Sequence, residues 1–266
     1  MITRRKITSV LFFIAVVFFM SCESNKNQMN IIFLHRSTGL NVYLGNTNPY
    51  VHKLFNKSDF ASYFKKLNKQ NNTNHNFEEQ SFPGTTEYGY KNYPYDYYNI
   101  WVKNGGDQPY KGAPTLEMLT KKYDVVIFKH CYSVSNIVKG NGQADVNSEE
   151  KTIENYKLQF EALKNKMHEF PDTKFIVWTP AVRHESSLSL EEAQNTKRFY
   201  EWMLNEWNEE GDNIYLWDFY KYETEGGLFL KDEFSSENGD SHPNKAFSAK
   251  MTPIFADFVY KVTNSK

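Results

Sequence analysis

A serine near the start of the chain and a histidine near its end stand in polar segments that suit chemistry. Ser37 lies in the stretch 35–39 (HRSTG), directly after the apolar run 31–34. His242 lies in the stretch 239–244 (GDSHPN), with Asp240 two residues before it. Ester hydrolysis by serine needs a hydroxyl at an exposed turn, an imidazole that accepts its proton and a carboxylate that orients the imidazole. Ser37, His242 and Asp240 are therefore a candidate catalytic set.

Each of these residues also has an ordinary structural interpretation. Ser37 could satisfy a loop amide, because serine is common at such positions. A histidine beside Pro243 suits the entry to a helix, and Asp240 could cap that helix through its carboxylate. The nearness of Asp240 to His242 in the sequence favours catalysis for the histidine.

A metal site is a further alternative. His35, His130, His242 and Asp240 are all predicted to lie near the same edge of the sheet, and zinc accepts such ligands. Their spacing matches no short metal motif, so no metal and no cofactor are predicted. Cys131 follows a buried strand and is more typical of a packing residue than of a nucleophile.

The elements that must position these side chains alternate along the chain. Short apolar runs without strict polar alternation are typical of strands covered on both faces, and they occur at residues 31–34, 124–129, 174–179 and 213–219, with a weaker candidate at 77–82. Helical spacing of apolar residues fills the intervals, with helices expected from Ser58, from near Ser148, over residues 189–210 and from near Pro243. Such alternation predicts an α/β fold with a parallel sheet, whose chemistry lies in the loops at the carboxyl ends of the strands.

This order of motifs resembles the SGNH/GDSL hydrolases over residues 31–262. Besides the early serine and the late Asp-x-His-Pro loop, the run 175–180 (FIVWTP) and the segment 198–202 (RFYEW) look like the late strand and helix of that family. The resemblance implies a three-layer α/β/α sandwich with a flavodoxin-like parallel sheet. It also implies that Ser37 is the nucleophile, His242 the general base and Asp240 its orienting acid.

The same resemblance implies an oxyanion hole made by the Ser37 amide, the Gly84 amide and an asparagine side chain after the third strand, for which Asn136 is the candidate. The chain departs from the family pattern at three places. Residues 35–38 read HRST in place of GDSL, no Gly-x-Asn-Asp block follows the third strand, and Asp-x-x-His is shortened by one residue. Arg36 or His130 could supply a missing donor, and Asp218 is a second candidate to orient the histidine.

The first 21 residues read as a targeting segment. Basic residues at 4–6 precede an apolar stretch of 14 residues, 7–20, which is short for a membrane span. A small residue before Cys22 resembles the lipobox of bacterial lipoproteins, so we expect cleavage before Cys22, lipidation of its thiol, a tether over residues 22–30 and anchoring in the bacterial cell envelope. The alternatives are an ordinary signal peptide or an uncleaved anchor.

The net charge of the chain argues against nucleic acid as a partner. The chain has 31 Lys and Arg against 32 Asp and Glu, a net charge of −1; without residues 1–21 the balance is 28 against 32, or −4. A strong nucleic-acid binder is therefore not expected. Residues 31–266 show no break that suggests two domains, although an aromatic insert near 83–113 carries Tyr88, Tyr90 and Trp101, which could contact a sugar or pack on the domain.

These observations predict an esterase that removes an acyl group, such as acetyl, from a carbohydrate or similar polar substrate. Two alternatives remain: a glycan-binding surface lipoprotein without catalysis on the same fold, and a glycan O-acyltransferase.

Overall fold

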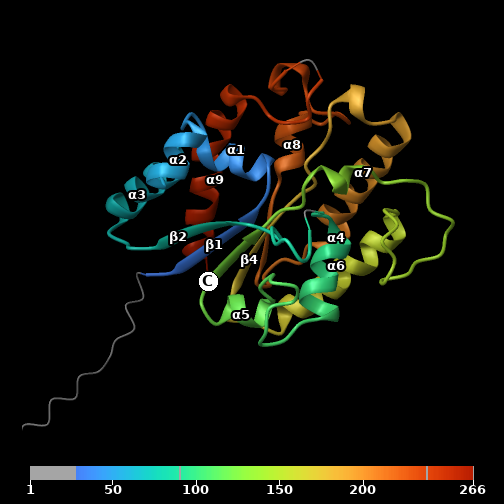
Figure 1. Cartoon of the computed structure of the whole chain (residues 1–266), viewed down its shortest axis with the longest axis horizontal. Coiled ribbons are helices and arrows are strands. Elements are labelled where there is room, and N and C mark those ends of the chain that lie inside the picture. Colours follow the sequence, from blue (N-terminus) through green and yellow to red (C-terminus); the bar gives the residue numbers. More distant parts are fainter. Residues whose placement is uncertain (1–27, 90, 238, 266) are drawn as a thin grey trace, which may run out of the picture.

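The computed structural model describes residues 28–89, 91–237 and 239–265 (Figure 1). All five strands run parallel in the order β2-β1-β3-β4-β5, the order of flavodoxin-like folds. The strands are β1 Asn30–His35, β2 Asn76–Ser81, β3 Val125–Phe128, β4 Lys174–Trp178 and β5 Ile214–Trp217. The expected three-layer α/β/α architecture is confirmed.

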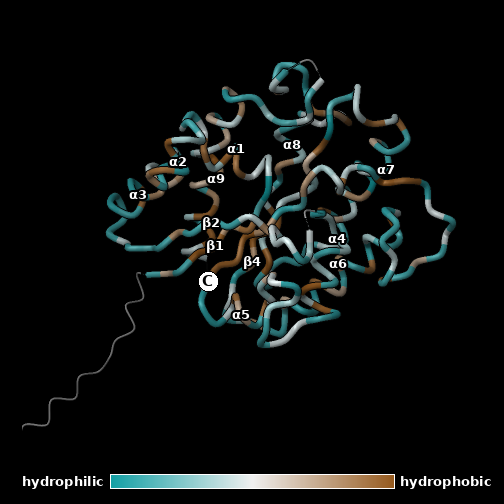
Figure 2. The backbone as a smooth tube through the Cα atoms, viewed as in Figure 1, coloured by the Kyte–Doolittle hydropathy of each residue, from teal (hydrophilic) through white to brown (hydrophobic). Residues whose placement is uncertain are grey.

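Burial explains which strands the sequence marks clearly. The apolar residues of β1, β3 and β4 are buried on both sides because helices cover both faces of the sheet. Figure 2 shows the hydrophobic colouring of the central strands. β2 forms one edge, and its residues NFEEQS are half-buried or exposed. An edge strand needs fewer apolar residues, which is why its sequence signal is weaker.

One helical layer packs against the odd-numbered residues of β1. It consists of α1 (Thr38–Leu44), α3 (Asp59–Asn71) and α9 (Lys245–Thr263), which contact one another. Its core is aromatic: Phe33 lies 5.4 Å from Trp178 and 5.2 Å from Phe255, measured between ring centroids. This layer carries the helix that begins beside each candidate catalytic residue, α1 after Ser37 and α9 after His242.

The opposite layer packs against Leu34 and Phe128. Its helices are α4 (Pro94–Tyr97), α5 (Leu116–Thr120), α6 (Ile153–His168) and α7 (Leu190–Trp202), with a π-helical turn after α4 at Tyr98–Lys103 and another after α7 at Met203–Trp207. Two further short α-helices are α2 (Pro49–Phe55) and α8 (Phe219–Thr224), and 3₁₀ turns lie at Tyr132–Ser135, Glu185–Ser187 and Asp232–Phe234.

Capping residues set the helix starts. The Ser58 and Ser189 side chains accept the amides of Ala61 and Glu192, as N-cap residues do. The helix expected from near Ser148 begins later, at Ile153, because the Thr152 hydroxyl accepts the Asn155 amide.

The last helix also begins after the residue expected. It starts at Lys245, two residues past Pro243, because the Asn244 side chain accepts the Phe247 amide. The cap is therefore Asn244, and the carboxylate of Asp240 is left for another partner.

Among the helices of the described chain, none combines the length and apolar character needed to cross a membrane. The expected signal peptide and Cys22 lie outside the described residues.

Candidate active site

The sharp turn between β1 and α1 presents Ser37 at the carboxyl edge of the sheet. Ser37 has φ 47° and ψ −103°, a backbone conformation that side chains other than glycine seldom adopt. Such a turn leaves its hydroxyl outside the strand. Gly39 permits the turn, because a Cβ there would lie 2.6 Å from the His35 Cβ and 2.7 Å from the Lys129 Cδ.

Tertiary folding brings His242 to this serine from the far end of the chain. The Ser37 Oγ and the His242 Nε2 form a hydrogen bond. The other ring nitrogen, Nδ1, lies 2.8 Å from the Asp240 Oδ1. The three predicted residues therefore make one continuous hydrogen-bonded relay, with the His242 and Asp240 side chains 40% and 46% exposed and hence open to solvent.

Asp240 is held in place as an ionised acceptor. Its Oδ1 also accepts the His242 backbone amide at 3.1 Å, and its Oδ2 accepts the Ser236 hydroxyl at 2.8 Å. Although partial burial opposes the charged form, the hydrogen bonds from His242 and Ser236 lower the pKa of Asp240 below its ordinary value. Because aspartate precedes histidine by only two residues, one short loop carries both partners.

Asp218 does not take part in this relay. It caps α8, where its carboxylate accepts the Lys221 amide at 3.4 Å, and it receives the Tyr200 hydroxyl at 3.2 Å.

The loop that carries His242 is fastened to the loop after β4. The His184 amide donates to the Ser241 hydroxyl at 3.2 Å, and the Ser186 hydroxyl donates to the Gly239 carbonyl at 3.3 Å. His184 itself bonds to Asp232 through its Nε2, at 2.8 Å. These contacts restrict the position of the imidazole relative to Ser37.

Tyr132 lies beside His242 and was not predicted from the sequence as a site residue. Its ring packs edge-on against the His242 ring, with centroids 4.9 Å apart. Its buried hydroxyl lies near Ser37 and Thr38 and has no hydrogen-bond partner within the described residues. Burial raises the pKa of Tyr132 well above its ordinary value, so the phenol keeps its proton. The sequence signal for Tyr132 was its position. It lies three residues after Lys129, the last residue of the predicted strand 124–129, in a loop that was expected to be polar.

Asn136 and Gly84, the two residues predicted for the oxyanion hole, lie in different surroundings. The Asn136 amide donates to the Glu192 carboxylate at the start of α7, at 3.3 Å, and is engaged there. Gly84 follows β2 with φ 56°, and a Cβ there would lie 2.6 Å from the Ser81 carbonyl oxygen. Glycine is thus required at this turn for its backbone conformation, whatever its amide binds.

The two candidate auxiliary donors also differ. His130 is buried in an aromatic pocket, 4.5 Å from Tyr97 and 5.3 Å from Phe160 between ring centroids, and this burial lowers its pKa to about 3. Its surroundings are those of a neutral core histidine. Arg36 is half-buried beside Ser37, and its carbonyl accepts the buried Lys129 ammonium at 3.4 Å. Lys129 thereby supports the turn that carries the serine.

The aromatic insert mostly packs on the domain. Trp101 is fully buried and donates through its indole to the Pro114 carbonyl at 3.1 Å, so in this structure it packs on the domain, the second of its two predicted roles. Tyr88 is half-buried and donates to the Asp96 carboxylate at 2.9 Å. Tyr90 lies outside the described residues.

The four residues considered for a metal site do not gather. His35 bonds through its Nε2 to Glu79 at 2.7 Å, and His130 lies in the aromatic pocket. Among the described residues, the group that could hold an ion is instead His168, Glu209 and Asp212, whose ligand atoms lie within 4.8 Å of one another.

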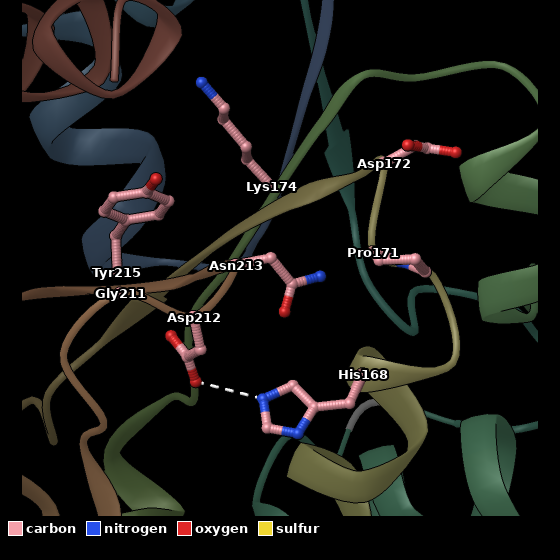
Figure 3. Close-up of a pocket in the computed structure, with 8 residues that line it drawn as sticks. All are labelled: His168, Pro171, Asp172, Lys174, Gly211, Asp212, Asn213 and Tyr215. Atoms are coloured by element: carbon pink, nitrogen blue, oxygen red, sulfur yellow. Dashed lines mark hydrogen bonds and ion pairs between the residues drawn. The ribbon is translucent and has the colours of Figure 1, made fainter. Parts of the chain in front are cut away.

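Two members of that group, His168 and Asp212, line an open cavity of about 470 Å³, shown in Figure 3. The cavity lies at the amino ends of β4 and β5, at the edge of the sheet opposite Ser37. His168 and Asp212 already bond to each other at 3.0 Å, and Glu209 pairs with Lys164 at 2.5 Å. The cavity is therefore separate from the relay.

Similarity to known proteins is confined to solved structures. No protein-family model matches the chain, and no curated protein does. A protein assigned as an acylhydrolase from Bacteroides fragilis has 11% identity over 91% of this chain and 88% of its own, with a TM-score of 0.43. A protein assigned as a lipase from Chitinophaga pinensis has 12% identity over 89% of this chain and 100% of its own, with a TM-score of 0.42.

A carbohydrate esterase with catalytic and non-catalytic binding functions has 14% identity over 89% of this chain and 65% of its own, with a TM-score of 0.41. A gut microbial diltiazem-metabolizing enzyme has 13% identity over 90% of this chain and a TM-score of 0.47, and this chain spans 47% of its length. These similarities concern the course of the chain, and the chemistry has to be judged from the site itself.

Proposed function

We propose that the protein is a serine ester hydrolase of SGNH type that removes a small acyl group, such as acetyl, from a carbohydrate or a similar polar alcohol. The observation that carries the proposal is the continuous relay from Ser37 through His242 to Asp240. A serine hydroxyl bonded to an imidazole that is itself bonded to a carboxylate is the arrangement that activates serine for acyl transfer.

The reaction would proceed in two steps. As the Ser37 Oγ forms its bond to the ester carbonyl carbon, its proton passes to the His242 Nε2, and the Asp240 carboxylate stabilises the imidazolium through Nδ1. The proton then passes from Nε2 to the leaving alcohol oxygen, which leaves an acyl group on Ser37. Water deacylates the enzyme by the same sequence, with His242 as its base.

The negative charge on the carbonyl oxygen needs donors close to Ser37. We assign this role to the Ser37 amide and to the Tyr132 hydroxyl, because that hydroxyl is buried near Ser37 and has no hydrogen-bond partner among the described residues. A tyrosine would thereby take the place of the asparagine that the family pattern lacks here. Gly84 remains a candidate for a further amide donor.

The alternatives are less well supported. A purely glycan-binding protein has no need of a complete relay beside a strained serine. A transferase would use the same relay, but the solvent exposure of the His242 side chain leaves the acyl-enzyme open to water. The anchoring of the domain in the cell envelope through Cys22 belongs to the same proposal.

The test is hydrolysis of p-nitrophenyl acetate by the parent protein and by Ser37→Ala and His242→Ala. We expect turnover by the parent and a loss of about 10³-fold or more in kcat for each variant, because members of such a relay act as a unit. Labelling of Ser37 by a fluorophosphonate should disappear in both. Parent-like turnover in both variants would exclude the mechanism.

A matched pair of carboxylates tests the orienting acid. Asp240→Asn should lower kcat on the order of 10⁴-fold, because the amide leaves the imidazole in the wrong tautomer. Asp218→Asn removes the same charge from the start of α8 and should change kcat by less than about tenfold. A larger loss from Asp218→Asn than from Asp240→Asn would reverse the assignment.

A further inference from the structure

The short helix α2 presents almost all of its side chains to solvent although several are large and apolar. None of its residues is buried, and Tyr50, Leu54 and Phe55 are 77%, 73% and 64% exposed. The helix is nevertheless well formed, since the Asn48 side chain accepts the Tyr50 amide at 2.8 Å and Asn56 ends it in the left-handed conformation. A capped helix with an uncovered aromatic and aliphatic surface is typical of an interaction site.

One inward side chain fastens α2 to the domain. The His52 Nε2 lies 3.2 Å from the Glu79 carboxylate of β2, and its ring packs edge-on against Tyr43 at 5.7 Å. Glu79 also holds His35, two residues before Ser37. The helix is thus fixed to the sheet edge while its apolar side chains point away from it.

The segment that forms α2 and α3 is strongly basic. Residues 50–70, which span α2 and α3, contain five lysines and one aspartate, a net charge of +4 in a chain whose total is −1. The lysines are all exposed: Lys53, Lys57, Lys65, Lys66 and Lys69. Exposed apolar side chains among lysines are the composition of helices that lie in the headgroup region of an anionic bilayer.

The described chain begins at this edge. The Met29 amide donates to His75 at 3.1 Å, and the Asn68 side chain of α3 donates to the His75 carbonyl at 2.9 Å, so the start of β1 lies against the end of α3 (Figure 1). The six residues 22–27 precede the described chain. At 3.3 to 3.6 Å per residue, they place Cys22 about 20 Å at most from the start of the described chain. A lipid on Cys22 would therefore keep this edge close to the bilayer.

From these observations we propose that α2 and the five exposed lysines of residues 50–70 form a docking surface for an anionic lipid bilayer. Tyr50, Leu54 and Phe55 enter the headgroup region, and the lysines pair with lipid phosphates. A basic surface of this kind adds to the membrane attachment that an acyl chain provides. The docked edge also fixes which way the Ser37 turn faces relative to the membrane. This proposal shares the lipid on Cys22 with the proposed function, but it does not depend on the esterase mechanism.

Tryptophan fluorescence tests the contact in the full chain. All five native tryptophans are buried, at 7% exposure or less: Trp101, Trp178, Trp202, Trp207 and Trp217. A new tryptophan at Leu54, 73% exposed, therefore reports on the docking surface, and one at Leu190 on α7, 58% exposed, is a matched control. Both variants are measured with vesicles of phosphatidylcholine containing one third phosphatidylglycerol and a spin-labelled lipid.

We expect the emission of Leu54→Trp to shift to the blue and to be quenched by the spin label, and that of Leu190→Trp to do neither. In the Leu54→Trp background, Lys53→Gln with Lys57→Gln should lower the ratio of docked to undocked protein about 10- to 30-fold, and high salt should act in the same direction. Equal quenching at positions 54 and 190, or none at either, would overturn the proposal. So would a blue shift of Leu54→Trp that grows with protein concentration in the absence of lipid, since a second copy would then cover the surface.

Hydrolysis of soluble p-nitrophenyl acetate by the same variants separates this proposal from the proposed function. Leu54 and the two lysines lie outside the relay, so turnover should equal that of the parent. Loss of quenching with unchanged turnover in the lysine variant supports docking by charge, and absence of turnover in the parent counts against the esterase alone.

Discussion

At the scale of single residues, the site depends on three side chains whose sequence distances differ greatly. Asp240 and His242 are two residues apart, so their contact is a property of one loop. Ser37 lies 205 positions from His242, and their hydrogen bond exists only because the fold closes. The contact between Asp240 and His242 therefore depends on local sequence, and the contact between Ser37 and His242 depends on the tertiary fold.

Tyr132 carries the first prediction at this scale. Tyr132→Phe keeps the ring that packs against His242 and removes only the hydroxyl that lies near Ser37. Loss of one oxyanion donor should lower kcat on the order of 10²–10³-fold with little change in KM. Steady-state kinetics with p-nitrophenyl acetate measures this.

Asn136→Ala is the matched control for Tyr132→Phe, because it removes the donor that the family pattern suggests. Since its amide is engaged by Glu192, we expect less than a tenfold change in kcat. A severe loss in Asn136→Ala together with a mild one in Tyr132→Phe would return the oxyanion role to the asparagine.

At the scale of elements, the start of α1 decides how Ser37 is presented. The helix begins one residue after the serine, and Gly39 lets its first turn pass close to β1 and Lys129. The contact is tight because Lys129 crosses beneath the turn to reach the Arg36 carbonyl. Helix α1 and β1 can meet at this point only without a side chain between them.

Gly39→Ala should therefore disturb both stability and activity. The new Cβ would lie under 3 Å from the Cβ of His35 and the Cδ of Lys129, and relief requires the helix start to move. We expect a loss of about 1–3 kcal/mol in the free energy of unfolding and a fall in kcat, because Ser37 shifts with the helix. Denaturant titration and the esterase assay measure the two effects.

Gly227→Ala serves as the control, since its Cβ would approach only the Thr224 carbonyl oxygen, at 3.1 Å. This variant should keep kcat at the parent value. Unchanged stability and turnover in Gly39→Ala would contradict the tight-packing account.

At the scale of the whole molecule, a buried carboxyl group makes stability depend on pH. Glu223 of α8 is fully buried and accepts the Val182 amide at 2.8 Å, which ties α8 to the loop after β4. Burial raises its pKa from 4.5 to about 8, against the opposing effects of that hydrogen bond and of Lys129. The folded protein therefore holds a proton on Glu223 more tightly than the unfolded chain does.

The sign of the pH dependence follows from this difference. The contribution of protonated Glu223 is fully present below pH 4.5 and is lost as pH rises toward 8, so the free energy of unfolding should fall across this interval. Glu223→Gln should flatten this part of the profile and make the protein more stable than the parent at pH 8.5. Denaturant titrations at several pH values measure the profile, with the exposed Glu225→Gln as control. An identical slope in Glu223→Gln and the parent would contradict the assignment.

Much of the architecture was predictable because its signals are local. The apolar runs at 31–34 and 174–179 are buried strands, and Ser58 and Ser189 cap helices as expected. The short helices α1, α2, α4, α5 and α8 were not predicted, since segments of four to seven residues hold too few turns for a periodic pattern. The start of α6 could not be predicted, because either Ser148 or Thr152 could have capped the helix, and the Thr152 hydroxyl is the one that accepts a backbone amide, that of Asn155.

The sequence by itself was enough to indicate a parallel α/β sandwich and to single out Ser37, Asp240 and His242. The reason is that the apolar runs of the strands and the Asp-x-His spacing are local features of the chain. The sequence could not show that Trp101 is buried, that Asn136 is engaged by Glu192, or that the Tyr132 hydroxyl lies near Ser37. Those outcomes depend on which side of the sheet each loop packs against, and packing between distant segments settles that. For the same reason, only the tertiary structure shows that Tyr50, Leu54 and Phe55 of α2 are exposed.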